Sequence, residues 1–360
     1  MRSAVVVGTG LIGTSVALAL SAQGVAVHLR DADPEAAGMA ASLGAGTVEA
    51  PTAAVDLAVL AVPPALVGSV LADAQAAGIA RHYTDVASVK AEPREDVVVL
   101  GCDTARYIGG HPMAGGEVSG PTAARADLFE GCTWVLTPTP DTGTETLNTA
   151  LELVATCGGT PVVMAAAEHD RVVGLVSHAP HVVAALVAKR LAKAGERAVS
   201  LAGPGVRDLT RIAGGDPDLW VDILSANAGV VADILEELGS DLGDAVAALR
   251  AMAATDEAKR DAGRQCVDAL LRQGRSGRRR IAGKHGIRPA RYRTLGVVVG
   301  DQPGQLARLF ADADRSGVNI EDIHLEHSTG RLTGVVRLSV DQRAAPALED
   351  ALHSQGWRIQ

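Results

Sequence analysis

The chain has 360 residues, of which 47% are hydrophobic and 21% charged, a balance that predicts a globular protein of two or three domains. Its net charge of −9 argues against a general nucleic-acid surface, and beyond the N-terminal apolar run no segment suggests a membrane span. The four cysteines are scattered, without a C-x-x-C pair, which predicts reduced thiols in a cytoplasmic protein.

The N-terminal segment 1–31 predicts a strand, a glycine-rich turn, a helix and a second strand. The turn is Gly8-Thr9-Gly10-Leu11-Ile12-Gly13, the G-x-G-x-x-G pattern in the strand–turn–helix context that dinucleotide binding requires. Gly8 allows the tight turn, Gly10 lets the backbone approach a pyrophosphate, and Gly13 lets helix and strand pack closely. The N-terminus of the following helix offers free N–H groups to that pyrophosphate.

Asp31 ends the second predicted strand, where a carboxylate binds both hydroxyls of a ribose. Because a carboxylate repels a 2′-phosphate, it favours NAD, with NADP the less favoured alternative. The adjacent Arg30 is able to serve a 2′-phosphate, so this choice stays open. The predicted cofactor contacts lie in the turn, at the end of this strand and after the strand 56–62: Gly8, Gly10, Leu11, Ile12, Gly13, Arg30, Asp31, Val62 and Pro63.

Strand and helix signals alternate from Met1 to about Met164, the order of an α/β, Rossmann-type doubly wound domain with a parallel sheet. From Ala165 the apolar spacing becomes helical, which predicts an all-helical second domain. Long helices often bury an apolar face against a partner chain, so we expect a homodimer. The predicted strands are 3–7, 25–29, 56–62, 83–86, 97–101, 107–110, 133–137 and 160–164, and the predicted helices 165–194, 217–239 and 241–272.

The segment 272–293 carries nine Lys and Arg residues, which favours a solvated linker over a site for RNA or an acidic partner. After it, the order strand–helix–strand–strand–helix–strand predicts a ferredoxin-like third domain without a catalytic cluster. The predicted divisions are a dinucleotide-binding domain 1–164, a helical substrate and dimerisation domain 165–273, the linker 274–292 and the C-terminal domain 293–360.

Two polar stretches that follow predicted strands carry candidate chemistry. In Asp85-Val86-Ala87-Ser88-Val89-Lys90, Ser88 faces the cofactor crevice, and its residue type suits a hydrogen bond to a substrate or base as well as a helix cap. In Gly109-Gly110-His111-Pro112-Met113-Ala114-Gly115-Gly116-Glu117, a histidine between glycines and a proline is placed for access. The near-neutral pKa of histidine suits removal of a hydroxyl proton while hydride leaves the same carbon.

Two further stretches lie in the helical region. Glu168-His169-Asp170 precedes Ser177-His178-Ala179-Pro180-His181, in which the two histidines share one helix face. Their spacing is not a zinc pattern, so it favours hydrogen bonds to a substrate over a metal. Gly203-Pro204-Gly205 leads Arg207 and Arg211, which suit bidentate carboxylate binding, although Asp208 is able to hold one of them in an ion pair.

Taken together, these stretches resemble the prephenate and arogenate dehydrogenases of tyrosine biosynthesis. The matching segments are GTGLIG, DVASVK, GGHPMAG-GE, SHAPH and RDLTRIAGGDPDLW, so the resemblance covers Met1 to about Leu271. In 294–360, DQPGQLARL and GVNIEDI resemble an ACT domain, a small regulatory module that often binds amino acids. The family reaction is NAD(P)-dependent oxidative decarboxylation of a cyclohexadienol, which aromatisation drives.

The resemblance implies a role for each candidate. His111 accepts the hydrogen bond of the ring C4 hydroxyl and takes its proton, and Ser88 orients His111. Arg211 holds the ring carboxylate with Asp208 in support. Further substrate contacts are implied at His181, Glu117 and Gly205, without a metal. The implied ACT effector is tyrosine or phenylalanine, with contacts expected at Asp301, Gly304, Asn319 and Ile320.

The predicted function is therefore NAD-dependent oxidation of prephenate to 4-hydroxyphenylpyruvate, and an arogenate dehydrogenase is the alternative. The 3-hydroxyacid dehydrogenases share this layout of a Rossmann domain followed by long helices. Enzymes of that type resemble one another in using a catalytic lysine on a helix that contains a glycine. The segment 177–194 has Lys189 and no glycine. A non-catalytic sensor of cofactor and amino acid is a rival of another class, and His111 and Arg211 in family positions count against it.

Overall fold

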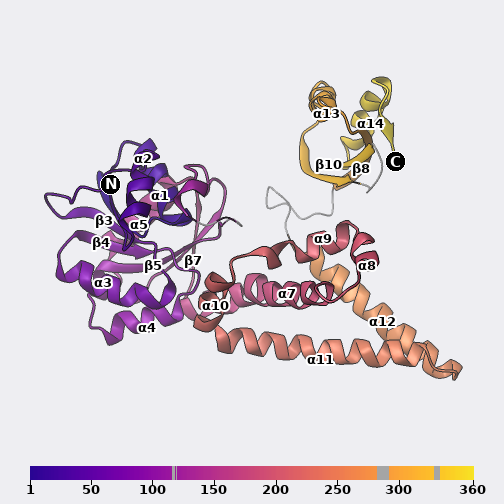
Figure 1. Ribbon diagram of the computed structural model, residues 1–360, viewed down its shortest axis with the longest axis horizontal. Helices are drawn as coiled ribbons and strands as arrows, with labels where there is room; N and C mark the ends of the chain where they lie inside the picture. The colour runs from indigo at the N-terminus through magenta and orange to yellow at the C-terminus, as the bar shows by residue number, and fades with distance from the viewer. Residues whose placement is uncertain (116–117, 119, 282–291, 328–332) are drawn as a thin grey trace. The chain divides into compact units, whose positions relative to one another are not determined.

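A computed structural model describes the chain except for residues 116–117, 119, 282–291 and 328–332. The chain forms two compact units, Met1–Leu238 and Gly239–Gln360, and each is described by itself. In the N-terminal unit, helices cover both faces of a seven-stranded sheet (Figure 1). Two apolar clusters, one on each face of the sheet, form its core.

The strand order of this sheet is β2-β1-β3-β4-β5-β6-β7, so the direction of winding reverses between β1 and β3. Neighbouring strands are parallel except for β5 and β6, which are antiparallel. The prediction of a wholly parallel sheet is therefore wrong at this edge, because a loop rather than a crossover helix joins β5 to β6. The strands are β1 (Ser3–Val7), β2 (Ala26–Arg30), β3 (Val55–Leu60), β4 (Ala80–Asp85), β5 (Tyr107–Pro112), β6 (Thr133–Thr137) and β7 (Thr160–Val163).

One predicted strand of this region, 97–101, is wrong. Its valines end helix α4, which makes the crossover that parallel strands β4 and β5 require. Val97 is buried in the core while Val99 is 82% exposed, so the run serves one helix face rather than a strand. The helices are α1 (Leu11–Ala22), α2 (Pro34–Ser42), α3 (Val67–Ala76), α4 (Ala91–Val99) and α5 (Thr144–Thr156).

The predicted helical region is confirmed, with different boundaries. The predicted helix 165–194 contains a single π-helical turn, η4, and the predicted helix 217–239 breaks at Asn227, which caps α10. Helix α11 then continues through Gly239, the predicted end. Its elements are α6 (Ala166–Val173), η4 (Gly174–His178), α7 (Ala179–Leu191), α8 (Glu196–Ser200), α9 (Pro204–Arg211), η5 (Ile212–Gly214), α10 (Pro217–Ala226), α11 (Ala228–Met252) and α12 (Glu257–Arg278).

The helical run Ala166–Leu191 is long and apolar enough to cross a membrane, with a mean hydropathy of 1.5, contrary to the expectation from sequence. One such helix is weak evidence for a membrane protein, since a core helix of a soluble protein meets the same criteria. Only 33% of its apolar window is buried. The run also carries four buried polar side chains that contact neighbouring elements: His169, Asp170, His178 and His181.

The C-terminal domain has the predicted ferredoxin-like order. Its four-stranded antiparallel sheet runs β11-β8-β10-β9, and the apolar face of the sheet packs against two helices. The prediction that 274–292 is all linker is wrong at its start, because α12 continues to Arg278. The elements are β8 (Tyr292–Gly300), α13 (Gln305–Asp314), β9 (Ile320–His327), β10 (Thr333–Asp341), α14 (Ala345–Ser354) and β11 (Arg358–Ile359).

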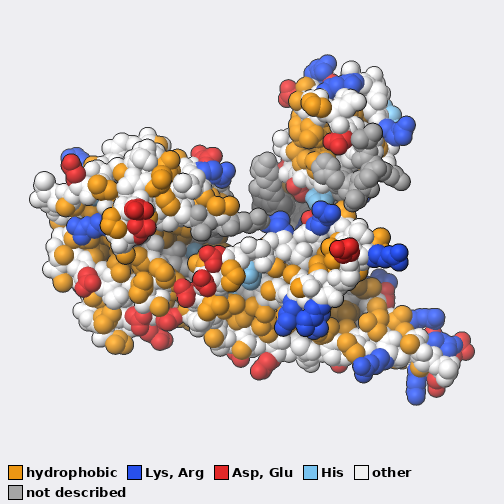
Figure 2. Space-filling view, viewed as in Figure 1, with side chains coloured by type: hydrophobic (Ala, Val, Ile, Leu, Met, Phe, Trp, Pro, Cys, Tyr) orange, Lys and Arg blue, Asp and Glu red, His pale blue; other side chains and the backbone are white. Residues whose placement is uncertain are grey.

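Hydrophobic side chains gather along the surface of α11 (Figure 2). Leu242 is 66% exposed and Leu249 is 56% exposed. Contact of these apolar side chains with water is unfavourable in free energy, and burial against a partner surface would remove it. The four cysteines are free thiols in the structure.

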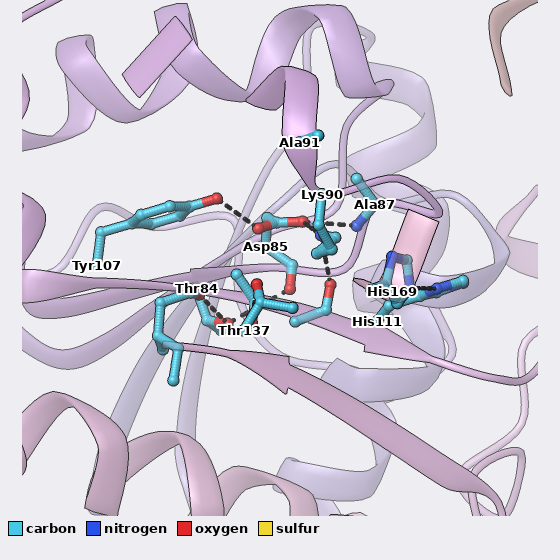
Figure 3. A network of polar contacts seen from close by, with 12 residues as sticks. Thr84, Asp85, Ala87, Lys90, Ala91, Tyr107, His111, Thr137 and His169 are labelled. Atoms are coloured by element: carbon cyan, nitrogen blue, oxygen red, sulfur yellow. Dashed lines mark hydrogen bonds and ion pairs between the residues drawn. The ribbon is translucent and has the colours of Figure 1, made fainter. Parts of the chain in front are cut away.

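A buried ion pair lies beneath the carboxyl end of β5 (Figure 3). Lys90, only 2% exposed, places its Nζ against Asp85 Oδ1 and donates to the carbonyl oxygen of Gly110 at 2.7 Å. Asp85 also accepts from Tyr107 Oη at 2.6 Å and from the Ala87 N–H at 2.8 Å. Burial lowers the pKa of Lys90, although the carboxylate opposes this shift.

The two glycines before His111 allow close packing around this pair. A Cβ on Gly109 would lie 2.5 Å from Thr137 Oγ1 and 3.2 Å from Lys90 Cδ. A Cβ on Gly110 would lie 2.6 Å from the carbonyl oxygen of Asp85. Both glycines lie in a buried strand, which confirms the predicted strand 107–110.

Replacing Lys90 by Met should leave the Asp85 carboxylate buried without its cation. Breaking a buried pair in this way costs about 3–5 kcal/mol of folding free energy. We expect a lower urea midpoint, measured by circular dichroism. In the control, Lys90→Met combined with Asp85→Asn removes both charges and should lose less stability than Lys90→Met alone; a larger loss would contradict the ion pair.

Candidate functional site

The predicted cofactor and catalytic residues of the N-terminal domain lie at the carboxyl ends of neighbouring strands. The glycine-rich turn follows β1, Val62 and Pro63 follow β3, Ser88 follows β4, and His111 lies near the end of β5. Ligands of open α/β sheets bind at this edge, beside the point where the strand order reverses. The topology thus brings these residues to one edge of the sheet.

The glycine-rich turn has the geometry that a dinucleotide needs. Gly8 has a φ of +96°, and a Cβ there would lie 2.1 Å from the carbonyl oxygen of Ala61. A Cβ on Gly13 would lie 1.9 Å from the carbonyl oxygen of Gly8, whereas the Cβ position of Gly10 is open. No side chain caps the N-terminus of α1, so its N–H groups are available to a pyrophosphate. The residues present therefore fit NAD.

Asp31 is fixed against the same turn. Its Oδ2 accepts from the Thr9 N–H at 2.5 Å and from Thr9 Oγ1 at 2.7 Å, and its Oδ1 accepts from the Asp33 N–H at 2.9 Å. Although burial opposes it, these hydrogen bonds hold the pKa of Asp31 below its ordinary value. The carboxylate is thus ionised and ordered beside the cofactor turn, next to the exposed Arg30.

His111 is the first member of a line of three hydrogen-bonded side chains. Its Nδ1 lies 2.8 Å from Nε2 of His169, and Nδ1 of His169 lies 2.7 Å from Oδ1 of Asp170 (Figure 3 shows the two histidines). The carboxylate of Asp170 also accepts from the backbone N–H groups of Lys90 at 2.8 Å and Ala91 at 2.7 Å. Helix α6 is thereby joined to the start of α4.

Burial, followed by the nearby His169, Lys90 and His178, holds the pKa of His111 well below the ordinary histidine value of 6.5. His111 is therefore neutral at neutral pH. Its Nε2 has no hydrogen-bond partner in the described part of the chain. A neutral imidazole with one free nitrogen at this edge of the sheet is able to accept a proton.

The second pair of histidines is ordered by Trp220. The rings of His181 and Trp220 stack at 3.5 Å between centroids, and His178 meets the same indole edge-on at 6.2 Å. His178 Nδ1 also lies 3.1 Å from Asn227 Nδ2, which donates to the carbonyl oxygen of Asp170 at 2.9 Å. The predicted shared face of the two histidines is thus confirmed, and buried contacts connect it to the His111 line.

His181 has an unsatisfied polar atom. It is 7% exposed, and its buried Nδ1 has no hydrogen-bond partner among the described residues. Burial lowers the pKa of His181 below the ordinary value. An orphaned buried nitrogen costs free energy unless a ligand or water satisfies it.

Arg211, Gly205 and Asp208 lie on α9, which packs against α7, the helix that carries His181. All three are exposed. The structure thus places the arginine-bearing helix beside the His181 helix. The binding roles of these residues stay predictions.

The predicted partner of His111 is not the one that the structure shows. Ser88 is half-buried and makes no hydrogen bond to any residue that the structure describes, whereas His169 bonds directly to His111. Glu117 lies outside the described residues. The described residues include no group of three or more side chains able to hold a metal ion.

The predicted effector residues lie at opposite ends of the C-terminal sheet, because Asp301 and Gly304 follow the end of β8, whereas Asn319 and Ile320 lie at the start of β9, which runs in the same direction as β8. Asp301 is exposed, and Gly304 has a left-handed φ of +87° at the start of α13. Asn319 donates to Glu321 Oε1 at 2.8 Å, and Ile320 begins β9. Their role in binding stays a prediction.

Sequence reasoning singled out Glu168-His169-Asp170 without finding its partner, and it missed Trp220 and Asn227. The signal for the first was a run of titratable residues at the start of an apolar helix. His169 lies 58 positions from His111, so only the fold reveals their contact.

Comparisons with known proteins agree with this geometry. Residues 16–163 match the nucleotide-binding domain of prephenate dehydrogenase, and residues 165–259 match its dimerization domain. A probable prephenate dehydrogenase, NovF, from Streptomyces niveus is 41% identical over 359 residues, 99% of either chain.

Solved structures give the same result. A prephenate dehydrogenase from Aquifex aeolicus, in complex with hydroxyphenyl propionate and NAD+, has a TM-score of 0.65 at 29% identity, covering 77% of this chain and 97% of that one. An arogenate dehydrogenase from Synechocystis has a TM-score of 0.63 at 26% identity, and the match covers 77% of this chain and 99% of that one. With both domain families matched in order and a relative aligned along its length, the chain belongs to the prephenate dehydrogenase family.

Proposed function

We propose that the chain catalyses the NAD-dependent oxidative decarboxylation of prephenate to 4-hydroxyphenylpyruvate. Family membership supports this reaction, and so does the relative from Streptomyces niveus, which aligns over the C-terminal domain as well. The observation that carries the proposal is the neutral His111, with a free nitrogen at the cofactor edge of the sheet. When bound in the glycine-rich turn, NAD accepts a hydride from the substrate.

His111 takes the proton of the ring C4 hydroxyl on Nε2. Removal of this proton lets the C4 oxygen form a carbonyl as the C4 hydride departs, and loss of the ring carboxylate as CO2 makes the ring aromatic. The electron pair of the broken bond to CO2 moves through the ring to the C4 oxygen, which takes up a proton to give the phenol, so the net loss from the substrate is one hydride and CO2. General base catalysis of this kind contributes roughly 10²–10⁴-fold to a rate.

The substrate is a dianion and the protein is net acidic, so the pocket needs local positive charge and hydrogen-bond donors. We assign the ring carboxylate to Arg211, supported by Asp208, on the strength of the family motif. His181 offers its orphaned nitrogen to the side chain of the substrate, and Gly205 offers its backbone. Ser88 and Glu117 complete the proposed pocket.

Arogenate is the second candidate substrate, and the similarity to an arogenate dehydrogenase favours keeping it. Arogenate differs from prephenate by an amino group in place of the side-chain ketone, and His181 is the proposed neighbour of that group. For the cofactor, the fixed carboxylate of Asp31 favours NAD over NADP, because a 2′-phosphate would meet like charge.

The ferredoxin-like C-terminal domain supports a regulatory role, and we assign it as an ACT domain that binds tyrosine or phenylalanine. Asp301, Gly304, Asn319 and Ile320 are the proposed contacts. The exposed leucines of α11 and the match to a dimerization domain support a homodimer. The unpaired cysteines suit a reducing cytoplasm.

The test of the function is a comparison of four reactions: prephenate or arogenate, each with NAD or NADP. We expect NADH, measured by absorbance, to form fastest from prephenate and NAD. Faster turnover of arogenate would move the assignment to the alternative. An absence of turnover in all four reactions would refute the proposed activity.

His111→Asn should lower kcat by about 10²-fold or more and leave KM near its normal value, because it removes the base but little binding. In the natural protein, kcat/KM should decline only when pH falls below 6.5, since the pKa of His111 is lowered and its neutral form is the active one. The variant should lack this acidic decline. His353→Asn, on an exposed part of α14, is the matched control.

Arg211→Ala should raise KM strongly, because a charge-assisted bidentate contact contributes on the order of 2–4 kcal/mol. The measurement is the steady-state rate as a function of prephenate concentration at saturating NAD. Arg197→Ala removes an exposed positive charge from the nearby helix α8 and serves as the control. An unchanged KM in Arg211→Ala would remove this residue from the carboxylate site.

A further inference from the structure

His111, His169 and Asp170 form a continuous hydrogen-bonded line whose inner end is sealed from water. His169 is 0% exposed and Asp170 is 3% exposed. The two bonds of the line measure 2.8 and 2.7 Å, and each joins one ring nitrogen of His169 to a different neighbour. His169 has no nitrogen left for solvent or substrate, so its protonation pattern depends on these two neighbours.

The charge of Asp170 determines which atom donates in the hydrogen bond between His169 and Asp170. Although burial opposes it, hydrogen bonds from His169 and from the backbone N–H groups of Ala91 and Lys90 hold the pKa of Asp170 below its ordinary value. The carboxylate is thus ionised at neutral pH and only accepts hydrogen bonds. Nδ1 of His169 must therefore carry a proton and donate it to Asp170.

This constraint passes along the line. Where Nε2 of His169 carries no second proton, its lone pair accepts a hydrogen bond. Nδ1 of His111 must then carry the proton and donate. The neutral His111 consequently has its lone pair on Nε2, the nitrogen without a partner among the described residues. The opposite pattern would place a proton on Nε2 and leave His111 unable to act as a base.

We propose that Asp170 and His169 are positioning residues that fix the tautomer of His111, so that Nε2 is ready to receive the hydroxyl proton. This inference rests on the proposed function for its catalytic consequence, while the tautomer itself is a property of the free protein. When His111 takes the proton on Nε2, its Nδ1–H bond to His169 strengthens, and the carboxylate of Asp170 stabilises the positive charge through His169. No further oxidant, reductant or co-reactant is needed.

The described groups that lower the pKa of His111, besides burial, are His169, Lys90 and His178. Lys90 lies on the segment after β4 and is paired with Asp85, yet its charge still contributes. His178, from η4, is uncharged at neutral pH, because burial lowers its pKa to about 4. Asp170 is thus the carboxylate whose charge is directed, through His169, toward His111.

The variant His169→Phe tests the line directly, because a phenyl ring accepts no hydrogen bond from Nδ1 of His111 and so releases the constraint on its tautomer. Asp170→Asn tests the charge instead, since Oδ1 of Asp170 accepts from both His169 and the Lys90 N–H, and an amide oxygen in that place would keep both bonds. The readout is the ¹⁵N NMR spectrum of the histidine-labelled full-length protein, with the signals of His111 identified by their absence in His111→Asn. We expect His111 Nε2 to be unprotonated in the natural protein and partly protonated in His169→Phe.

The same variants should separate positioning from mere structural support. Asp170→Asn is nearly the same size as the natural residue, yet we expect kcat to fall about 10²-fold or more with KM little changed. Asp170→Glu fits less well but keeps the charge, and it should retain more activity than the Asn variant. A purely structural role would give the opposite order. His169→Phe leaves the bonds of Asp170 to Lys90 and Ala91 in place and should also lose kcat.

Glu168→Gln is the matched control, because it removes an exposed carboxylate from the adjacent position of α6. It should leave kcat and both tautomers unchanged. A protonated Nε2 in natural His111, an unchanged tautomer in His169→Phe, or full kcat in His169→Phe would overturn the proposal. If the natural protein turns over no prephenate, the proposed function fails, and the NMR spectra still decide whether the line fixes the tautomer.

Discussion

The buried ammonium group of Lys90 is the constraint on which the architecture of this site depends. An unpaired charge in a protein interior costs several kcal/mol, so everything around Lys90 must satisfy it. Asp85 supplies the opposite charge, and the carbonyl oxygen of Gly110 supplies an acceptor. The backbone N–H of Lys90 also donates a hydrogen bond to Asp170 of α6. One lysine therefore ties β4, β5 and the first helix of the helical region to one another, immediately below His111.

The strands and helices were largely predictable from sequence because apolar periodicity determines which faces are buried. The errors arose where tertiary structure decided between alternatives. The valines at 97–99 have a high strand propensity, but a crossover between parallel strands required a helix there. Gly239 was read as a helix end, yet α11 passes through it, and the true break is Asn227, whose side chain bonds to the backbone of Asp170. Such a bond has no local sequence signal.

The candidate site was predictable where its residues occur in short motifs at the ends of strands. The glycine turn and His111 belong to this class, and the fold brings both to one edge of the sheet. The partners of His111 were not predictable in the same way, since they come from a helix more than fifty positions away. Gly109 and Gly110 show the same limit. Their place in a strand was predictable, but the atoms that exclude a Cβ, on Thr137 and Lys90 at Gly109 and on the backbone of Asp85 at Gly110, are brought there by the fold.

The two buried carboxylates near His111 therefore serve different purposes. Asp85 contacts the ammonium group of Lys90 and also accepts a hydrogen bond from Tyr107, so it stabilises the fold. Asp170 faces His169, and its charge is available to orient and polarise that ring. The positive charge of Lys90 disfavours protonation of His111 even with Asp85 beside it. Asp170, acting through His169, is therefore the carboxylate placed to offset that charge when His111 takes up a proton.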